Sequence, residues 1–102
     1  MVDMEREFKA VMRDGKVVIG LRQTRKMIER KKAKMVVVAR NCPEKEEIER
    51  MAKEKGIPVL MFSGKGIELG PLCGKPFAIS AFAVLDEGRS SILKLAGGSA
   101  DG

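Results

Sequence analysis

Four short runs of apolar, largely β-branched residues alternate with segments in which apolar residues recur at helical spacing. The runs cover Lys16–Gly20, Lys34–Ala39, Pro58–Phe62 and Phe77–Leu85. Runs this short and this apolar are typical of strands that are buried on both faces. Strands that alternate with helices form a sheet covered by helices on both sides. The pattern therefore predicts an α/β fold, a three-layer α-β-α sandwich around a small mixed, mainly four-stranded sheet.

The segments between the strands predict helices over residues 3–14, 21–32, 43–55 and 67–73. Gly15 and Gly56 follow two of them as terminating glycines, and Pro43 suits the first position of another. A short final strand over Ile92–Leu95 is expected to pair with the preceding strand like a hairpin, and residues 97–102 read as a frayed tail. No repeat or linker interrupts the pattern, so residues 1–102 are predicted to form a single domain.

The positive charge of the chain is concentrated in one block. Lys and Arg number 20 against 14 Asp and Glu, which gives a net charge of +6. Nine of those cations and a single acid, Glu29, lie between Lys16 and Arg40. A local basic block on an otherwise nearly neutral chain favours a surface that binds a polyanion such as nucleic acid. The alternative is the solvated helix surface of a heat-adapted protein, since 33% of all residues are charged.

Several classes of function are disfavoured by the residues that are missing. The chain has no His, Tyr or Trp, so the commonest general acid–base residue is absent and no catalytic residue is predicted. Cys42 and Cys73 are too few for a zinc site, and we expect free thiols, no metal and no cofactor. The segment Gly70–Pro76 resembles a P-loop, but it has three residues between its glycines instead of four, and Pro76 replaces the Ser or Thr. No apolar run reaches about 20 residues, so no membrane contact is expected. The acidic N-terminus is unlike a secretory signal and predicts a cytoplasmic protein.

The strongest candidate for function is a set of residues dispersed over several loops. Gly20 joins the first strand to the basic helix, where free backbone N–H groups could bind a phosphate beside Arg22, Arg25 and Lys26. Gly20 would let a nucleic-acid backbone approach closely, although it could equally serve a tight turn alone. Either interpretation places a conformational demand on this position.

Two further positions lie near the ends of predicted strands. Asn41 follows the second strand and could contact a base edge, or it could simply cap the next helix. Phe77 precedes the fourth strand and could stack on an extruded base, or it could be a core residue. The residues alone leave both alternatives open.

The ordered motifs of the chain resemble those of a ribosomal protein family. The segments Gly20-Leu-Arg22-Gln-Thr, Val-Val-Val-Ala-Arg40-Asn41, Gly56-Ile-Pro58-Val, Glu68-Leu-Gly70 and Gly74-Lys-Pro-Phe77 are similar to the L-thirty-e family of archaeal and eukaryotic large-subunit proteins. This family belongs to the kink-turn-binding superfamily, and the resemblance covers nearly the whole chain.

The resemblance implies a structural constituent of the large ribosomal subunit that binds a sharply bent kink-turn of ribosomal RNA. In that family three loops meet the RNA, and the matching residues here are Gly20, Arg22 and Gln23, then Asn41, then Gly70, Lys75 and Phe77. The resemblance also allows contact with neighbouring ribosomal proteins, and we expect a monomer when the protein is free. Cys42, Cys73 and Pro76 lie outside the family pattern, which leaves the shape of the third loop open.

Two rival functions remain from the sequence. A sister member of the superfamily could bind kink-turns of guide or regulatory RNAs. The Arg22-Gln23 pair argues against the guide-complex members, which typically have Asn-Glu there. An enzyme acting on phosphates near Gly64–Gly74 is the second rival, and the missing His weakens it.

Overall fold

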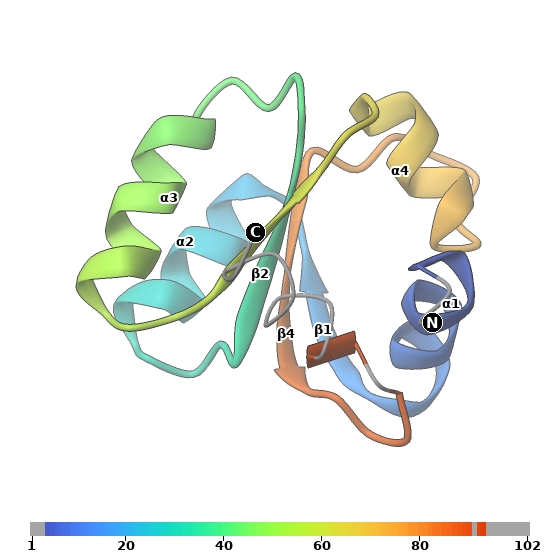
Figure 1. Cartoon of the computed structure of the whole chain (residues 1–102), viewed down its shortest axis with the longest axis horizontal. Coiled ribbons are helices and arrows are strands. Elements are labelled where there is room, and N and C mark those ends of the chain that lie inside the picture. The colour runs from blue at the N-terminus through green and yellow to red at the C-terminus, as the bar shows by residue number, and fades with distance from the viewer. Residues whose placement is uncertain (1–3, 91, 94–102) are drawn as a thin grey trace.

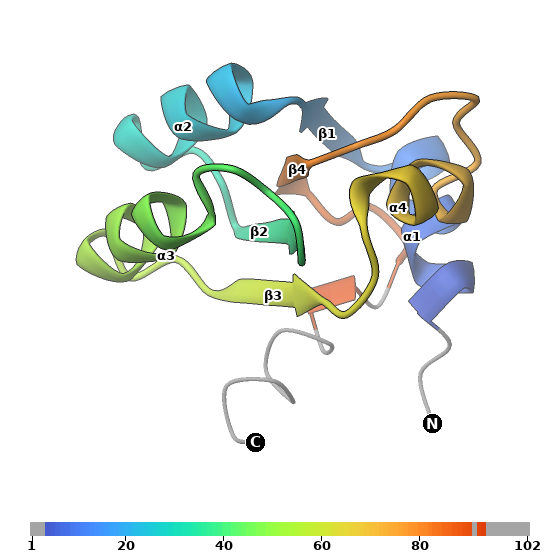
Figure 2. The same ribbon diagram turned by 90° about the horizontal axis from the view of Figure 1, so that it is seen from above.

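A computed structural model describes residues 4–90, 92 and 93 as a sheet covered by helices on both faces (Figure 1). In chain order the elements are α1 (Met4–Asp14), β1 (Lys16–Ile19), α2 (Leu21–Glu29), β2 (Met35–Ala39), α3 (Lys45–Glu54), β3 (Val59–Phe62), α4 (Gly66–Leu72) and β4 (Ala81–Asp86). Helices α1 and α4 cover one face, and α2 and α3 cover the other (Figure 2). The predicted three-layer α/β sandwich is confirmed.

The sheet has the strand order β1-β4-β2-β3 and is mixed. Strand β4 lies between β1 and β2 and is antiparallel to both, whereas β3 runs parallel to β2. Strands β1, β2 and β3 therefore all point the same way, and their carboxyl ends share one edge of the sheet with the beginning of β4. This arrangement places the loops that the sequence singled out at a common edge.

Strand β2 is the centre of both hydrophobic cores, and all five of its residues are buried. Because side chains alternate across a strand, Met35, Val37 and Ala39 enter the core under α1 and α4. Val36 and Val38 enter the core under α2 and α3. Helices on both faces thus explain why this strand reads as an unbroken apolar run rather than as an alternating one.

Aromatic packing fixes the first layer of helices on the sheet. Phe8 of α1 is fully buried and contacts Phe82 of β4 in an edge-to-face arrangement, with ring centroids 5.6 Å apart. The ring of Phe62 in β3 lies 6.3 Å from that of Phe8. Pairs in this range of geometry contribute about 0.5–1.5 kcal/mol beyond the area they bury.

The fourth strand begins later than the sequence predicted. It starts at Ala81 rather than at Phe77, because residues 77–80 pass closely under α4 before they join the sheet. The Ile79 N–H donates to the Gly66 carbonyl at 3.0 Å, so this N–H bonds to the beginning of α4 and not to a neighbouring strand.

The predicted final strand is also wrong for the residues that are described. Ile92 and Leu93 have helical backbone conformation, and Ile92 is fully buried in the core under α1. An apolar side chain can be buried from a helical segment as well as from a strand. The apolar pattern over so few residues therefore cannot distinguish a short strand from a helical turn. The rest of that predicted strand and the tail at 97–102 lie outside the described residues.

Gly70 is predicted to be indispensable for the contact between α4 and the segment before β4. A β-carbon at this position would overlap the carbonyl oxygen of Phe77 and press on the backbone of Ala78. Because backbone atoms cannot rotate away, we expect Gly70→Ala to lower the free energy of unfolding by about 1–3 kcal/mol or more. Chemical denaturation would measure this loss. Lys53→Ala, on the exposed face of α3, is the control and should unfold like the wild type; equal stability of both variants would contradict the packing argument.

Candidate nucleic-acid interface

Three loops and the first turn of α2 meet at the edge of the sheet where β1, β2 and β3 end. We call this surface the loop edge and define it by residues 20–23, 40–41, 63–66 and 74–80. Backbone hydrogen bonds tie its parts together: Gly20 donates to Ala81 at 2.9 Å, and Ala39 donates to Ser80 at 2.8 Å. The Arg40 N–H donates to the Gly64 carbonyl at 2.9 Å. The loops are therefore held in place by backbone hydrogen bonds to the sheet and to one another.

Gly20 has a conformation that favours glycine, and it faces open space. Its φ is +109°, and a β-carbon built on it would meet no atom within 4 Å. No side chain of the described residues caps α2, so the first N–H groups of this helix remain available at the loop edge. The turn at Gly20 is thus one that favours glycine, and no described protein atom fills the space next to it.

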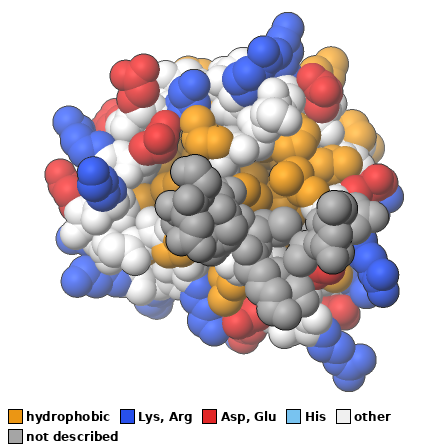
Figure 3. Space-filling model, viewed as in Figure 1, with side chains coloured by type: hydrophobic (Ala, Val, Ile, Leu, Met, Phe, Trp, Pro, Cys, Tyr) orange, Lys and Arg blue, Asp and Glu red, His pale blue; other side chains and the backbone are white. Residues whose placement is uncertain are grey.

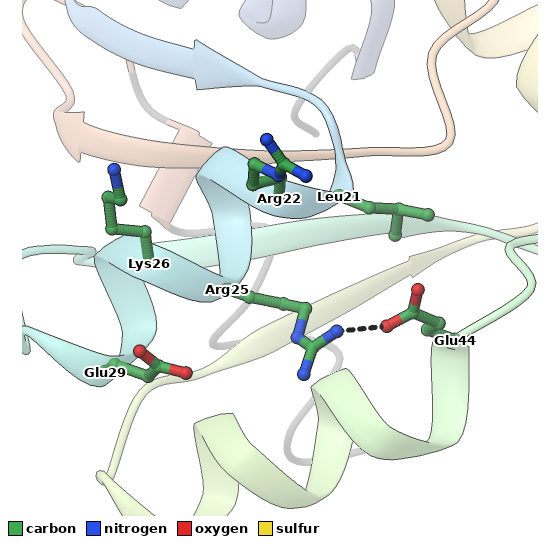
Figure 4. Close-up of a pocket in the computed structure, with 6 residues that line it drawn as sticks. All are labelled: Leu21, Arg22, Arg25, Lys26, Glu29 and Glu44. Atoms are coloured by element: carbon green, nitrogen blue, oxygen red, sulfur yellow. Dashed lines mark hydrogen bonds and ion pairs between the residues drawn. The ribbon is translucent and has the colours of Figure 1, made fainter.

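Arg22, Gln23 and Lys26 are exposed residues of α2. Figure 4 shows the side chains of Arg22 and Lys26 projecting from this helix. Neither cation has a carboxylate partner among the described residues. The first turn of α2 also contains no acidic residue. The N-terminal end of this helix therefore presents the positive charge of Arg22, which no carboxylate in the described part of the chain neutralises.

Arg25 differs from its neighbours because it binds acidic side chains at the beginning of α3, those of Glu44 just before the helix and of Glu47 in its first turn. Its Nη1 donates to Glu44 Oε1 at 2.7 Å and its Nη2 donates to Glu47 Oε1 at 3.2 Å. The side chain of Arg25 is only 37% exposed. It lines a hollow of about 450 Å³ with Arg22 and Lys26, but it points towards Glu44 and away from them (Figure 4). Its visible role is to connect α2 with α3.

Asn41 connects the end of β2 to the beginning of α4. Its Oδ1 accepts a hydrogen bond from the Gly66 N–H at 2.9 Å. The next helix, α3, receives no side-chain cap from any described residue, so the alternative that Asn41 caps it is wrong. The residue as a whole is exposed, and its Nδ2 has no acceptor among the described residues. Asn41 thus presents a hydrogen-bond donor whose orientation is fixed by the bond on the other side of the amide.

The third loop brings together a buried glycine, a half-buried lysine and an exposed ring. Gly70 is buried in α4 against the Phe77 backbone, and its carbonyl accepts from the Lys75 N–H at 2.9 Å. Lys75 itself is half-buried. Phe77 is 50% exposed, so its side chain is not a core residue. Of the three, Gly70 shapes the loop, while Lys75 and Phe77 are accessible from outside.

Ile67 is an exposed apolar residue that the sequence interpretation did not single out. It directly follows Gly66, which bonds to Asn41, and it is 71% exposed. Its helix buries Gly66, Leu69 and Gly70, so Ile67 lies off the buried face of α4. In the sequence, the only signal for Ile67 would have been an apolar residue away from the predicted buried face of this helix.

Both cysteines are buried and free. Burial raises the pKa of the Cys73 thiol to about 12 and also raises the pKa of Cys42. Both are therefore neutral thiols near pH 7, whereas a metal requires the thiolate. In the part of the chain that the structure describes, no three His, Cys, Asp or Glu side chains come together in a way that could hold a metal ion. None of the described helices is long and apolar enough to cross a membrane.

The fold and the loop edge place this chain in the class of small α-β-α sandwich proteins with cationic, amide and aromatic side chains at the edge where the parallel strands end. The chain belongs to the ribosomal protein L7Ae/L30e/S12e/Gadd45 family, whose model matches residues 3–94. The family resemblance inferred from the motifs is thereby confirmed.

Relatives of this chain match it over most of their length. It is 44% identical over 92 residues to the large ribosomal subunit protein eL30 of Methanosarcina mazei, covering 90% of this chain and 87% of the relative. The protein of the same name from Pyrobaculum calidifontis is 44% identical over 97 residues, which covers 93% and 96% of the two chains. That from Sulfolobus acidocaldarius is 42% identical over 92 residues, with 88% of each chain covered.

Proposed function

We propose that this protein is a structural constituent of the large ribosomal subunit in the cytoplasm and that it binds a kink-turn of ribosomal RNA through the loop edge. The names of its relatives support the ribosomal role, and they agree with the expectation of a protein that is not an enzyme. The observation that carries the RNA-binding part is the half-exposed ring of Phe77, which belongs to the same loop edge as the unpaired Arg22 and the free amide donor of Asn41. Among the described residues, no contact accounts for that combination.

Each part of the loop edge suits a different part of a bent RNA. Gly20 and the first turn of α2, with Arg22 and Gln23, would bind phosphates through N–H groups and a cation, and Lys26 would add charge from the last turn of the same helix. Asn41 Nδ2 would donate to an acceptor on a base edge, and Phe77 would stack on a base that the bend extrudes. Lys75 would contact the backbone beside that base. Through these contacts the protein would recognise the bent shape of the RNA as well as its negative charge.

Two of the residues proposed for the interface act mainly by positioning others. Gly70 allows α4 to press against the Phe77 backbone. Arg25 links α2 to α3 through Glu44 and Glu47 and so supports the loop that carries Asn41. We further propose that residues 1–102 act as one domain and bind as a monomer, with neighbouring ribosomal proteins as additional partners.

A titration with two RNAs tests the proposed function. The protein should bind an RNA that contains a kink-turn more tightly than a straight duplex of equal length and composition, because only the bent RNA offers extruded bases to Phe77 and Asn41. Fluorescence anisotropy at constant salt would measure both affinities. Equal affinity for the two RNAs would sink the proposal.

Phe77→Ala should separate binding from stability. We expect RNA affinity to fall by about 1–3 kcal/mol, the range for loss of a base–aromatic stack, while thermal unfolding stays close to that of the wild type. Phe77→Tyr keeps the ring and should keep the affinity. Phe82→Ala, which truncates a fully buried ring, is the contrast and should cost about 3–5 kcal/mol of stability. A Phe77→Ala variant that behaves like Phe82→Ala would show that the ring serves packing.

Two variants of Asn41 should distinguish its two hydrogen-bonding atoms. Asn41→Asp keeps the acceptor for the Gly66 N–H and should unfold near the wild-type midpoint. Asn41→Ala removes that acceptor and should lose about 0.5–2 kcal/mol of stability, as for a lost cap. Both variants lack the Nδ2 donor, so both should weaken kink-turn binding by about 1–3 kcal/mol. Calorimetry and RNA titration on the same samples would check this; full RNA affinity of Asn41→Asp would refute the donor role.

A further inference from the structure

The basic block of the sequence does not lie on one surface. Helix α2 spans nine residues from Leu21 to Glu29, about 14 Å along its axis. Its first turn belongs to the loop edge, whereas its last turn and the connection to β2 lie at the opposite edge of the sheet (Figure 1). Four cations within five residues, and no acid, follow the helix there: Arg30, Lys31, Lys32 and Lys34.

Strand pairing adds a fifth cation to this opposite edge. Lys16 begins β1 and pairs with Asp86 at the end of β4, while Lys34 directly precedes β2 and donates its N–H to Val84 of β4. Lys34 is bound to Glu87 at 2.9 Å. Lys16, Arg30, Lys31 and Lys32 are exposed and have no carboxylate partner among the described residues. We call these four residues the distal basic cluster.

Cations near the end of a helix also have a purely structural explanation, because they complement the helix dipole. The backbone of Lys31 argues that this explanation is insufficient. Lys31 has φ +55°, and it is the only residue other than glycine with a positive φ among the described residues. A left-handed conformation is unfavourable for a side chain with a β-carbon.

Helix α3 ends with the same backbone hydrogen bonds as α2, but it has a glycine at the position that corresponds to Lys31. At the end of α3, Gly56 donates to Lys53 and Ile57 donates to Ala52, with Gly56 at φ +70°. At the end of α2 the same two bonds run from Lys31 to Ile28 and from Lys32 to Met27. The two endings are thus equivalent, and glycine is the residue this position favours. In α2 a lysine occupies it, between two further cations.

We propose that the distal basic cluster is a second RNA-binding surface, which binds the phosphate backbone of an RNA segment separate from the one at the loop edge. Its four cations offer charge without an aromatic or amide group for reading bases, so it would bind by charge and shape alone. This proposal rests on the proposed function only in identifying the RNA segment at the loop edge as a kink-turn. Its consequence is that the protein holds two RNA segments on opposite ends of one sheet.

A competition experiment with the full-length protein tests this surface. The protein is first saturated with unlabelled kink-turn RNA, and a labelled straight RNA duplex is then titrated in, with binding followed by anisotropy. We expect the duplex to bind the preformed complex. Loss of one phosphate contact should weaken duplex binding roughly eightfold at about 0.1 M salt, since each contact changes log K by ~0.9 log[salt].

Lys31→Gly is the decisive variant because it removes charge while relieving the backbone. Its thermal midpoint should be unchanged or up to roughly 4–8 °C higher, its duplex affinity should fall about eightfold, and its kink-turn affinity should stay within twofold of the wild type. Lys16→Ala should weaken duplex binding in the same way from a different strand. Lys55→Ala, at the equivalent end of α3, is the matched control and should change neither affinity.

Three results would overturn the proposal. They are complete displacement of the duplex by kink-turn RNA, an equal loss of both affinities in Lys31→Gly, or wild-type duplex affinity in that variant. A protein that shows no preference for the kink-turn RNA would instead refute the proposed function. In that case the dependence of duplex binding on Lys31 and Lys16 would still decide the role of the distal basic cluster.

Discussion

The insertion of β4 between β1 and β2 is the constraint on which the rest of the molecule depends. Because β4 runs antiparallel to both neighbours, its beginning lies where β1 and β2 end. That reversal brings the segment around Phe77 beside Gly20 and Asn41, which are far from it in the sequence. A fourth strand parallel to the others would have placed Phe77 at the opposite edge. The composition of the loop edge is thus a consequence of strand direction.

Two tertiary contacts connect the parts of the loop edge. Asn41 accepts the Gly66 N–H, which ties the end of β2 to the beginning of α4. Gly70 lets the same helix rest directly on the Phe77 backbone. A surface that is ordered before its ligand arrives loses less conformational entropy on binding. Helix α4 therefore matters to the proposed function through these two contacts, which its backbone makes with the neighbouring loops.

Charge in this protein is sorted by position along α2. The first turn contributes to the loop edge, Arg25 in the middle is neutralised by Glu44 and Glu47, and the last turn leads into the distal basic cluster. A pair of acidic residues between two cationic regions divides what the sequence presents as one block. The two ends are separated by the length of the sheet, which is more than a Debye length of about 10 Å at 0.1 M salt. They can therefore act on different ligands.

The sequence by itself determined the layers, most of the element boundaries and the family. These depend on local signals: apolar periodicity, glycines after α1 and α3, and motifs in a fixed order. It could not place the start of β4, because the contact of Gly70 with Phe77 is a tertiary one that overrides the strand pattern of residues 77–80. Nor could it show that Asn41 caps a helix 25 residues away, that Arg25 is paired, or that Phe77 is exposed while Phe82 is buried. Those outcomes were decided only by the tertiary structure, since exposure and pairing depend on which distant segments the sheet brings together.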